Sequence, residues 1–286
     1  MKLNANATEQ SKNELPFEIC IGDIDRLWDD ANRATTPSHL VITPTDLHQR
    51  NLEQRLRKQQ RPHSNFAFRR ISELAGDITD NQTSVSTALD RVDRLVLLEE
   101  VIEQKGDMPV YEHLGAALGT PLEKHIERLE RTRSELELVT GFHPRRMETF
   151  ASLLGDDSKP ATVDSLDILA GVSYLHRDLQ DRLSSGADRS PSQAVSKTSL
   201  LCRALRTLHT DQSSWRRVYP DIETLSVTGI SMLTAPVADL CRLLSETTNI
   251  DIRVHLREAT GPQIRRQVAA ETTVGTFGQQ GVFEWR

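Results

Sequence analysis

The stretch from His39 to Gln60 constrains the fold of this chain more than any other. It begins with a short apolar run, Leu40-Val41-Ile42, and passes through Thr43-Pro44-Thr45-Asp46 into an amphipathic stretch. A short apolar run that stops at a turn predicts a buried strand, and the 3.6-residue period that follows predicts a helix. The step from strand through tight turn to helix is typical of a parallel α/β sheet.

The turn between this strand and this helix is where we expect a function. Asp46 is predicted to cap the helix with its carboxylate, and the ring of Pro44 cannot extend a strand ladder. In parallel sheets, ligands usually bind where strands end and helices begin. Thr43-Pro44-Thr45 is therefore the predicted functional segment. The helix that follows is expected to bury its apolar points, Leu47, Leu52 and Leu56.

Composition excludes several classes of function. A net charge of −6 over 286 residues argues against broad nucleic-acid binding by charge alone, although a local basic strip stays open. The cysteines, Cys20, Cys202 and Cys241, lack the paired spacing of a zinc site, and their use indicates a reducing, cytoplasmic setting. No apolar run approaches the roughly 20 residues of a membrane helix. We expect no metal, no cofactor and no membrane contact.

The first predicted strand, Phe17–Gly22, precedes a predicted helix over Asp23–Ala34, which is where a nucleotide phosphate loop would lie. Such a loop needs several glycines, a lysine for the β- and γ-phosphates and a Ser or Thr for magnesium. Here Gly22 is followed directly by Asp23, and carboxylates at a helix start compete with a bound anion. ATP is not expected to bind at this degenerate phosphate loop.

The rest of the chain indicates one α/β domain interrupted by helices. Strands are predicted at Asn65–Phe68 and Ile222–Ile230, and the alternation in Ile250–Leu256 predicts a strand near a sheet edge. From Tyr111 to about Leu183 the period is helical. Residues 16–110 and 198–257 are therefore assigned to a discontinuous α/β domain, and residues 111–197 to a helical insertion and linker. Residues 1–15 are predicted as a disordered tail, and residues 258–286 as a terminal segment that could begin a missing domain.

Three features occur in an order that resembles a known family. They are the phosphate-loop position at Gly22, a strand ending in Ile42-Thr43-Pro44-Thr45, and a later strand ending in Val227-Thr228-Gly229-Ile230. Over roughly residues 17–260 the chain looks like the N-terminal helicase-like half of the B subunit of AddAB-type helicase–nucleases, which is related to RecC and to UvrD/Rep-like helicases. The resemblance implies a P-loop-NTPase-like (UvrD-type) parallel sheet with a large helical insertion.

The resemblance also implies that ATP chemistry is lost. In active helicases of that superfamily, the strand matching Leu225–Ile230 ends in Asp-Glu, which holds magnesium and polarises the attacking water. Here Thr228 and Gly229 stand at this degenerate metal-motif position. The family function that remains is a non-hydrolysing subunit, with no catalytic residue, acting in DNA repair and recombination beside an active helicase or nuclease partner.

Candidate contacts to single-stranded or duplex-end DNA follow from the same comparison. Thr43, Thr45 and Arg50 lie in or just after the turn, and Arg216 and Arg217 form a basic pair later in the chain. Hydroxyls and guanidinium groups of this kind bind backbone phosphate. The simpler interpretation is an amphipathic helix with a basic solvent face. Two functions stay open: a DNA-binding scaffold subunit, or a protein-interaction scaffold that does not contact DNA.

Overall fold

The computed structural model describes residues 16–22, 27, 37–61, 63–80, 86–119, 121–154, 163–185 and 193–265. The chain divides into two compact units. The sheet unit comprises residues 1–74, 205–233 and 237–286, and the helical unit comprises residues 75–204 and 234–236. Within the described residues, no helix combines the length and apolar character needed to cross a membrane.

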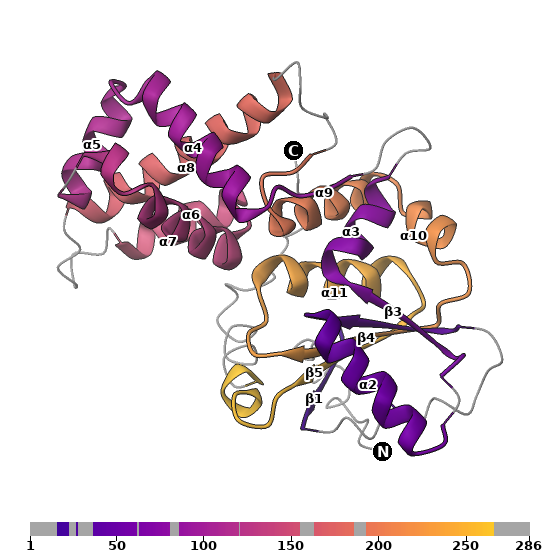
Figure 1. Ribbon diagram of the computed structural model, residues 1–286. Helices are drawn as coiled ribbons and strands as arrows, with labels where there is room; N and C mark the ends of the chain where they lie inside the picture. Colours follow the sequence, from indigo (N-terminus) through magenta and orange to yellow (C-terminus); the bar gives the residue numbers. More distant parts are fainter. Residues whose placement is uncertain are drawn as a thin grey trace, which may run out of the picture. The chain divides into compact units, whose positions relative to one another are not determined.

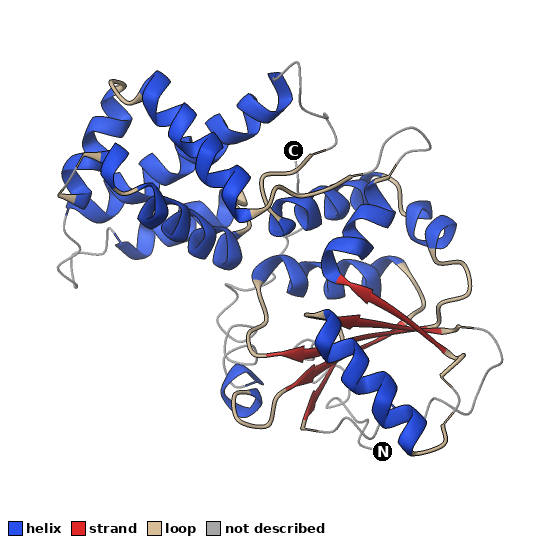
Figure 2. Ribbon diagram, in the orientation of Figure 1, coloured by secondary structure: helices blue, strands red, loops and turns tan. Residues whose placement is uncertain are grey.

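The sheet unit is built on a five-stranded, wholly parallel sheet (Figures 1 and 2). The strand order is β1-β5-β4-β2-β3. This confirms the α/β class and the parallel sheet predicted from the sequence. The strands are β1 (Glu18–Ile21), β2 (His39–Thr43), β3 (Phe66–Arg70), β4 (Thr224–Ile230) and β5 (Asp251–Leu256).

Strand β2 is the buried strand that the apolar run predicts, since all five of its residues are buried. Helix α2 (Asp46–Lys58) covers one face of it, where Val41 packs with Leu52, Leu56 and Phe66. Leu47, predicted to be buried, is 69% exposed. The burial of Leu52 and Leu56, which are one turn apart, sets the face of the helix that meets the sheet, and Leu47 lies off that face.

Strand β5 lies between β1 and β4, next to the edge strand β1, which agrees with the position near a sheet edge predicted from its alternating sequence. Its polar residues are accommodated by partners inside the unit. Arg253 pairs with Asp251 at 2.5 Å and with Glu18 at 3.7 Å. The Nε2 atom of His255 lies 3.4 Å from the Ser226 hydroxyl. Alternation thus marks paired polar groups here rather than a solvated face.

The remaining elements of the sheet unit connect or cover the strands. Helix α10 (Ser213–Val218) leads into β4, and most of α11 (Ala235–Thr247) follows it. In Figure 1, α2 and α11 lie on opposite faces of the sheet. The predicted helix over residues 23–34 lies outside the described residues except for Leu27, which is helical and fully buried. Two further helices, α3 (Ile71–Thr79) and α9 (Lys197–Thr210), contribute residues to both units.

The described elements of the helical unit contain no strand. They are α4 (Arg91–Lys105), α5 (Pro109–Leu118), the short 3₁₀ helix η3 (Leu122–Lys124), α6 (Ile126–Thr140), α7 (Pro144–Leu154) and α8 (Val163–Ser185). Their core is a cluster of aliphatic side chains from α4, α5, α6 and α8, with Leu97, Leu114, Leu129 and Leu175 fully buried. Gly141 ends α6 in the left-handed conformation, and Pro144 opens α7.

Candidate functional site

The carboxyl ends of the parallel strands gather several residues that the sequence places far apart. Because all five strands run the same way, the segments that follow them meet along one edge of the sheet. This edge, here called the carboxyl edge, carries Gly22 after β1, Thr43 at the end of β2, Arg70 at the end of β3, Gly229 in β4 and Arg257 after β5.

The start of α2 forms the exposed part of the carboxyl edge. Thr45 is the N-cap, with extended backbone (φ −148°, ψ 156°), and its hydroxyl accepts a hydrogen bond from the His48 amide at 3.2 Å. The predicted cap, Asp46, is instead the first residue of the helix. Thr45 is exposed, and so is Arg50 one turn later. The side chain of Arg50 makes no hydrogen bond or ion pair with any other residue that the structure describes. Its guanidinium group is therefore available to a ligand.

Two threonines at this edge face inward. Thr43 is only 1% exposed, and its hydroxyl finds no hydrogen-bond partner within the described ranges. Thr228 is fully buried and donates its hydroxyl proton to the Ile42 carbonyl at 3.0 Å, which ties β4 to β2. The structure therefore places the predicted contact Thr43 and the degenerate metal-motif position Thr228 in the interior, beneath the surface formed by Thr45 and Arg50.

Gly229 leaves no space for a side chain. Its backbone has φ +68°, and a Cβ atom built on it would lie 2.6 Å from Nε2 of His48. Contacts that short do not occur in folded proteins, and positive φ is itself costly for any residue with a Cβ. An acidic side chain at this position would have to displace the His48 ring.

His48 is a component of this edge that the sequence did not reveal. Its Nε2 atom is buried and has no hydrogen-bond partner among the described residues. Burial, followed by the nearby positive charges of Arg257 and Arg55, lowers the pKa of His48 below its ordinary value. The imidazole is therefore held neutral against Gly229. Arg257 adds a further contact, since its Nε donates to the Gly229 carbonyl at 3.3 Å while the residue stays exposed.

An ion pair closes the β3 end of the carboxyl edge. Arg70 donates from Nε and from its backbone amide to the Glu73 carboxylate at 2.9 and 2.8 Å, and it also lies 3.5 Å from Asp46. Partial burial would raise the pKa of Glu73, but the hydrogen bonds and charge of Arg70 outweigh it and hold that pKa below its ordinary value. Arg70 is thus engaged, and the freer cations of this edge are Arg50 and Arg257.

At the first strand, Gly22 has φ +68° and donates its amide proton to the Leu256 carbonyl at 3.1 Å. This bond places the degenerate phosphate-loop position beside the end of β5, as expected for a turn at the carboxyl edge. Asp23, the other residue of that position, lies outside the described residues.

The predicted basic pair Arg216 and Arg217 does not lie at the carboxyl edge. Arg216 and Arg217 are exposed on α10, which precedes β4 and lies on the side where the strands begin (Figure 1). Arg217 is paired with Asp211 at 2.8 Å, and hydrogen bonds from Ser213, Arg217 and Ser214 lower the pKa of Asp211. Trp215, between these groups, is 1% exposed and packs on Tyr219 with ring centroids 5.0 Å apart, so it presents no stacking surface.

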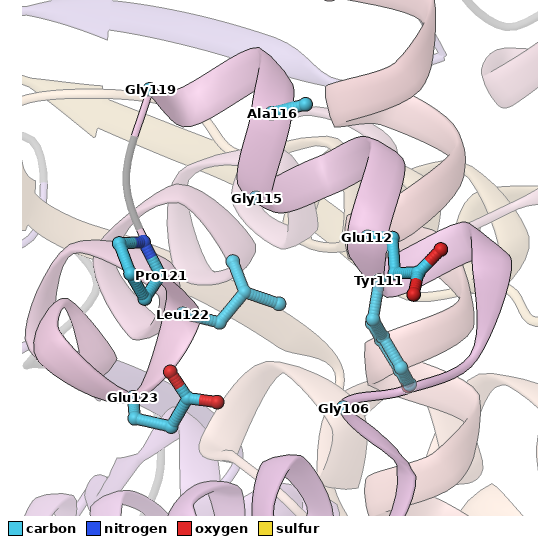
Figure 3. A pocket seen from close by; sticks show the side chains of 9 residues that line it. All are labelled: Gly106, Tyr111, Glu112, Gly115, Ala116, Gly119, Pro121, Leu122 and Glu123. Atoms are coloured by element: carbon cyan, nitrogen blue, oxygen red, sulfur yellow. The ribbon is translucent and has the colours of Figure 1, made fainter.

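The helical unit has a pocket of different character (Figure 3). It encloses about 420 Å³ between the end of α4, α5 and η3, and its ionisable lining groups are Glu112, Glu123 and Tyr111. The Tyr111 hydroxyl donates to Asp178 at 2.6 Å, and burial together with that carboxylate raises its pKa. This lining would repel a phosphate. In the described part of the chain, no cluster of three or more His, Cys, Asp or Glu residues could hold a metal ion.

Sequence reasoning located this edge but missed His48, Arg70 and Arg257 on it. Arg70 and Arg257 each end or follow a strand, which is a usable signal once the strands are assigned. His48 carries no such signal, because its role depends on a contact with Gly229, 181 residues later in the chain.

Comparison with known families agrees with this fold. A family model described as Halobacterial UvrD-like protein matches residues 4–284, and the chain belongs to this family. No curated protein matches the chain. The family match confirms the helicase-related part of the resemblance drawn from the sequence. The narrower assignment to the B subunit of AddAB-type enzymes stays a prediction.

Proposed function

We propose that this UvrD-like chain is a non-catalytic subunit that holds DNA beside an active helicase or nuclease in a DNA-repair complex. The observation that carries the proposal is the closure of the Gly229 position by His48 on the carboxyl edge. A helicase motor needs a carboxylate near this point to hold magnesium and orient water. This chain fills the space with a neutral imidazole and keeps exposed cations beside it.

The residues at the two degenerate positions support loss of ATP hydrolysis. Thr228 uses its hydroxyl to join two strands, and Gly229 cannot take a side chain without moving His48. At the other position, the Gly22 amide is hydrogen-bonded to Leu256. Backbone amides of a phosphate loop must instead point at the anion. These residues have structural uses that compete with ATP chemistry.

The exposed groups of the carboxyl edge support contact with nucleic-acid backbone. Thr45 presents a hydroxyl, and Arg50 and Arg257 present guanidinium groups, all exposed on one unit. Helix α2 adds Arg55, Arg57 and Lys58 in its last turn. Guanidinium groups donate in the geometry that phosphate oxygens accept. Of the sequence-predicted contacts, Thr45 and Arg50 are the ones best placed to touch a strand directly.

The helical unit is included in the proposal as an insertion between β3 and β4. The elements α4 to α8 follow β3 and precede β4 in the chain, and they form their own core. The sequence predicts a helicase-like domain of residues 16–110 and 198–257, interrupted by a helical insertion and linker of residues 111–197. Because α4 packs in the core of the helical unit, which begins at residue 75, we propose that the insertion includes α4 as well. The proposed insertion presents surface to DNA or to a partner subunit.

The test is binding of a labelled single-stranded oligonucleotide by fluorescence anisotropy across a salt series. Arg50→Glu and Arg257→Glu should each weaken binding several-fold and lower the slope of log K against log salt by about 1, since each removes one phosphate contact. Arg216→Glu, on the side where the strands begin, is the matched charge control and should change binding less. Unchanged binding in both edge variants would refute the proposed interface, and ATP turnover by the purified chain would refute the non-catalytic role.

A protein-interaction scaffold is the second candidate, and the surface of α4 favours it. Val92 and Val96 lie one turn apart on this helix and are 67% and 47% exposed. Neighbouring exposed valines could form part of a larger apolar patch once a partner is bound, and contiguous apolar patches mark docking surfaces. If the chain binds a helicase or nuclease partner without DNA, Val92→Asp with Val96→Asp should abolish that complex, whereas Arg50→Glu with Arg55→Glu should leave it intact.

A further inference from the structure

Helices α4 and α6 of the helical unit contact each other through their first turns. Arg91 Nη2 lies 3.4 Å from Glu127 Oε1, and Arg94 Nε lies 2.6 Å from Glu130 Oε1. Both pairs join residues separated by 36 positions, one helical turn apart on each helix. The first turns of the two helices therefore lie close together.

A groove of about 560 Å³ opens between these two helix starts. Four arginines line it, Arg91, Arg94, Arg128 and Arg131, against two glutamates, Glu127 and Glu130. Every one of these residues belongs to the helical unit, so this arginine groove is formed independently of the carboxyl edge. Arginines predominate among the charged residues of this groove, whereas the charged residues that line the pocket in Figure 3 are glutamates.

The pairs in the arginine groove differ in how firmly they are held. Arg94 and Glu130 are 17% and 6% exposed, and Glu130 is also bonded to the buried Arg133, so this pair is fixed. Arg91 and Glu127 are 67% and 77% exposed, and Arg131 and Glu135 are 80% and 64% exposed. Exposed pairs contribute little to stability because water and salt screen them, and a stronger acceptor can replace the carboxylate.

Arg128 is the most available cation of the arginine groove. Its side chain is exposed, and the guanidinium group makes no hydrogen bond or ion pair with another described residue. Arg128 and Arg131 are three residues apart on one face of α6, so their guanidinium groups reach the same side of the groove. With Arg91 opposite, three exposed arginines converge on one hollow. Helix α6 also begins without a side-chain cap, which leaves amide protons at its start.

We propose that the arginine groove binds the phosphate groups of a nucleic-acid strand and gives the helical unit a contact site of its own. Three exposed guanidinium groups around a hollow match the repeated phosphates of a strand, and each forms forked hydrogen bonds with them. The bound strand displaces Glu127 from Arg91 and Glu135 from Arg131, while Arg94–Glu130 holds the two helix starts in place. This site does not depend on the proposed role of the carboxyl edge.

The experiment uses the full chain and a labelled single-stranded oligonucleotide, with anisotropy measured over a salt series and circular dichroism at each salt concentration. Arg128→Glu with Arg131→Glu should weaken binding at least tenfold and lower the salt slope by about 2. Arg177→Glu is the matched control, since Arg177 is exposed on α8 over the ring of Tyr174 and away from the groove. Equal losses in the groove variant and in the control would overturn the proposal, as would unchanged binding in the groove variant.

A gain-of-function variant keeps the proposal testable if the charge reversals disturb folding. Glu127→Gln removes the carboxylate that competes for Arg91 and should tighten binding two- to fivefold; weaker or unchanged binding contradicts the site.

Tripolyphosphate is then added as a competitor. Displacement of the oligonucleotide from the unaltered chain at low tripolyphosphate concentration would assign the groove to free phosphates instead. If Arg50→Glu loses binding and the groove variant does not, the carboxyl edge binds DNA and the proposal for the arginine groove is overturned. If only the groove variant loses binding, the arginine groove binds DNA and the carboxyl edge does not.

Discussion

The two units of this protein bury polar groups in different ways. On the sheet, Nε2 of His39 lies 2.8 Å from the Ser226 hydroxyl, which lies 3.4 Å from Nε2 of His255, so three strands share one row of polar side chains. The helical unit instead buries a cation, Arg133, which is 0% exposed. A parallel sheet has its register set by the backbone ladder, whereas packed helices can slide unless side chains fix them.

The buried cation is surrounded by acceptors. Arg133 donates to Glu130 at 2.7 Å and to Glu137 at 3.0 Å. Glu137 also accepts the hydroxyl protons of Ser196, at 2.8 Å, and Ser199. Hydrogen bonds from Arg133 and Arg94 lower the pKa of Glu130 against the opposing effect of its burial. This network links α6 to α4 and to the start of α9. It therefore fixes the relative positions of these helices, as the backbone hydrogen bonds do for the strands of the sheet.

The largest expected effect is loss of that cation. Arg133→Met leaves Glu130 and Glu137 buried without their main partner, which should cost about 3–5 kcal/mol. Urea unfolding followed by far-UV circular dichroism measures it. Trp215 is buried in the sheet unit and no tryptophan lies within residues 75–204, so tryptophan fluorescence does not report on the helical unit.

Two controls sharpen this prediction. Arg131→Met removes an exposed partner of Glu135 and should leave the unfolding midpoint nearly unchanged. Adding Glu137→Gln to Arg133→Met should recover part of the loss, because one buried charge disappears. Equal shifts of the fluorescence and dichroism transitions would show that the two units unfold together, which would weaken the contrast drawn between them.

Acid should destabilise the helical unit through His143. Burial, then the charges of Arg146 and Arg145, lower the pKa of His143 to about 4. The unfolded chain, with an ordinary value of about 6.5, binds the proton first, so stability falls as the pH drops from about 6.5 to 4 and levels off below. The expected loss is about 1–3 kcal/mol, since one pKa unit corresponds to about 1.4 kcal/mol and part of the shift is screened by solvent. His143→Gln should flatten that part of the pH profile, and an unchanged difference between variant and parent across this range would contradict the assignment.

In the sheet unit, the tightest contact at the carboxyl edge can be probed with Gly229→Ala. Positive φ and the His48 ring both oppose a Cβ, and we expect a loss of about 2 kcal/mol in stability. In a His48→Ala background the collision is absent, so the same change should cost about 1 kcal/mol. A cycle of the two substitutions measures the coupling. Additive costs would mean that His48 moves freely away from Gly229.

The smallest effect separates folding from function at the start of α2. Thr45→Ala removes the N-cap and should cost about 1 kcal/mol. Thr45→Asp keeps a capping oxygen, so stability should hold, but the added negative charge should weaken oligonucleotide binding. Retained binding in a stable Thr45→Asp variant would argue that the start of α2 does not contact DNA.

How far the sequence could be interpreted differs between the two units. The apolar run at Leu40–Ile42 and the later strand at Leu225–Val227 indicate a parallel sheet, and both prove to be buried strands. The alternation in Asp251–Leu256 correctly predicts a strand near the sheet edge, but it does not reveal the partners of Arg253 and His255, because Glu18 and Ser226 lie far away in sequence. In the helical unit, the period gives the helices and places Arg133 on the face of Leu129 and Leu136, but it does not give the distant serines, Ser196 and Ser199, that complete the buried network through Glu137.

What the sequence determined by itself is local: short apolar runs that make strands, the 3.6-residue period that makes helices, and the side chains available at Gly22, Thr228 and Gly229. Only the tertiary structure decided which polar groups are buried with partners, that His48 fills the space beside Gly229, and that the starts of α4 and α6 surround a groove of arginines. The physical reason is that burial and charge pairing depend on contacts between distant segments, whereas chain conformation follows from neighbouring residues.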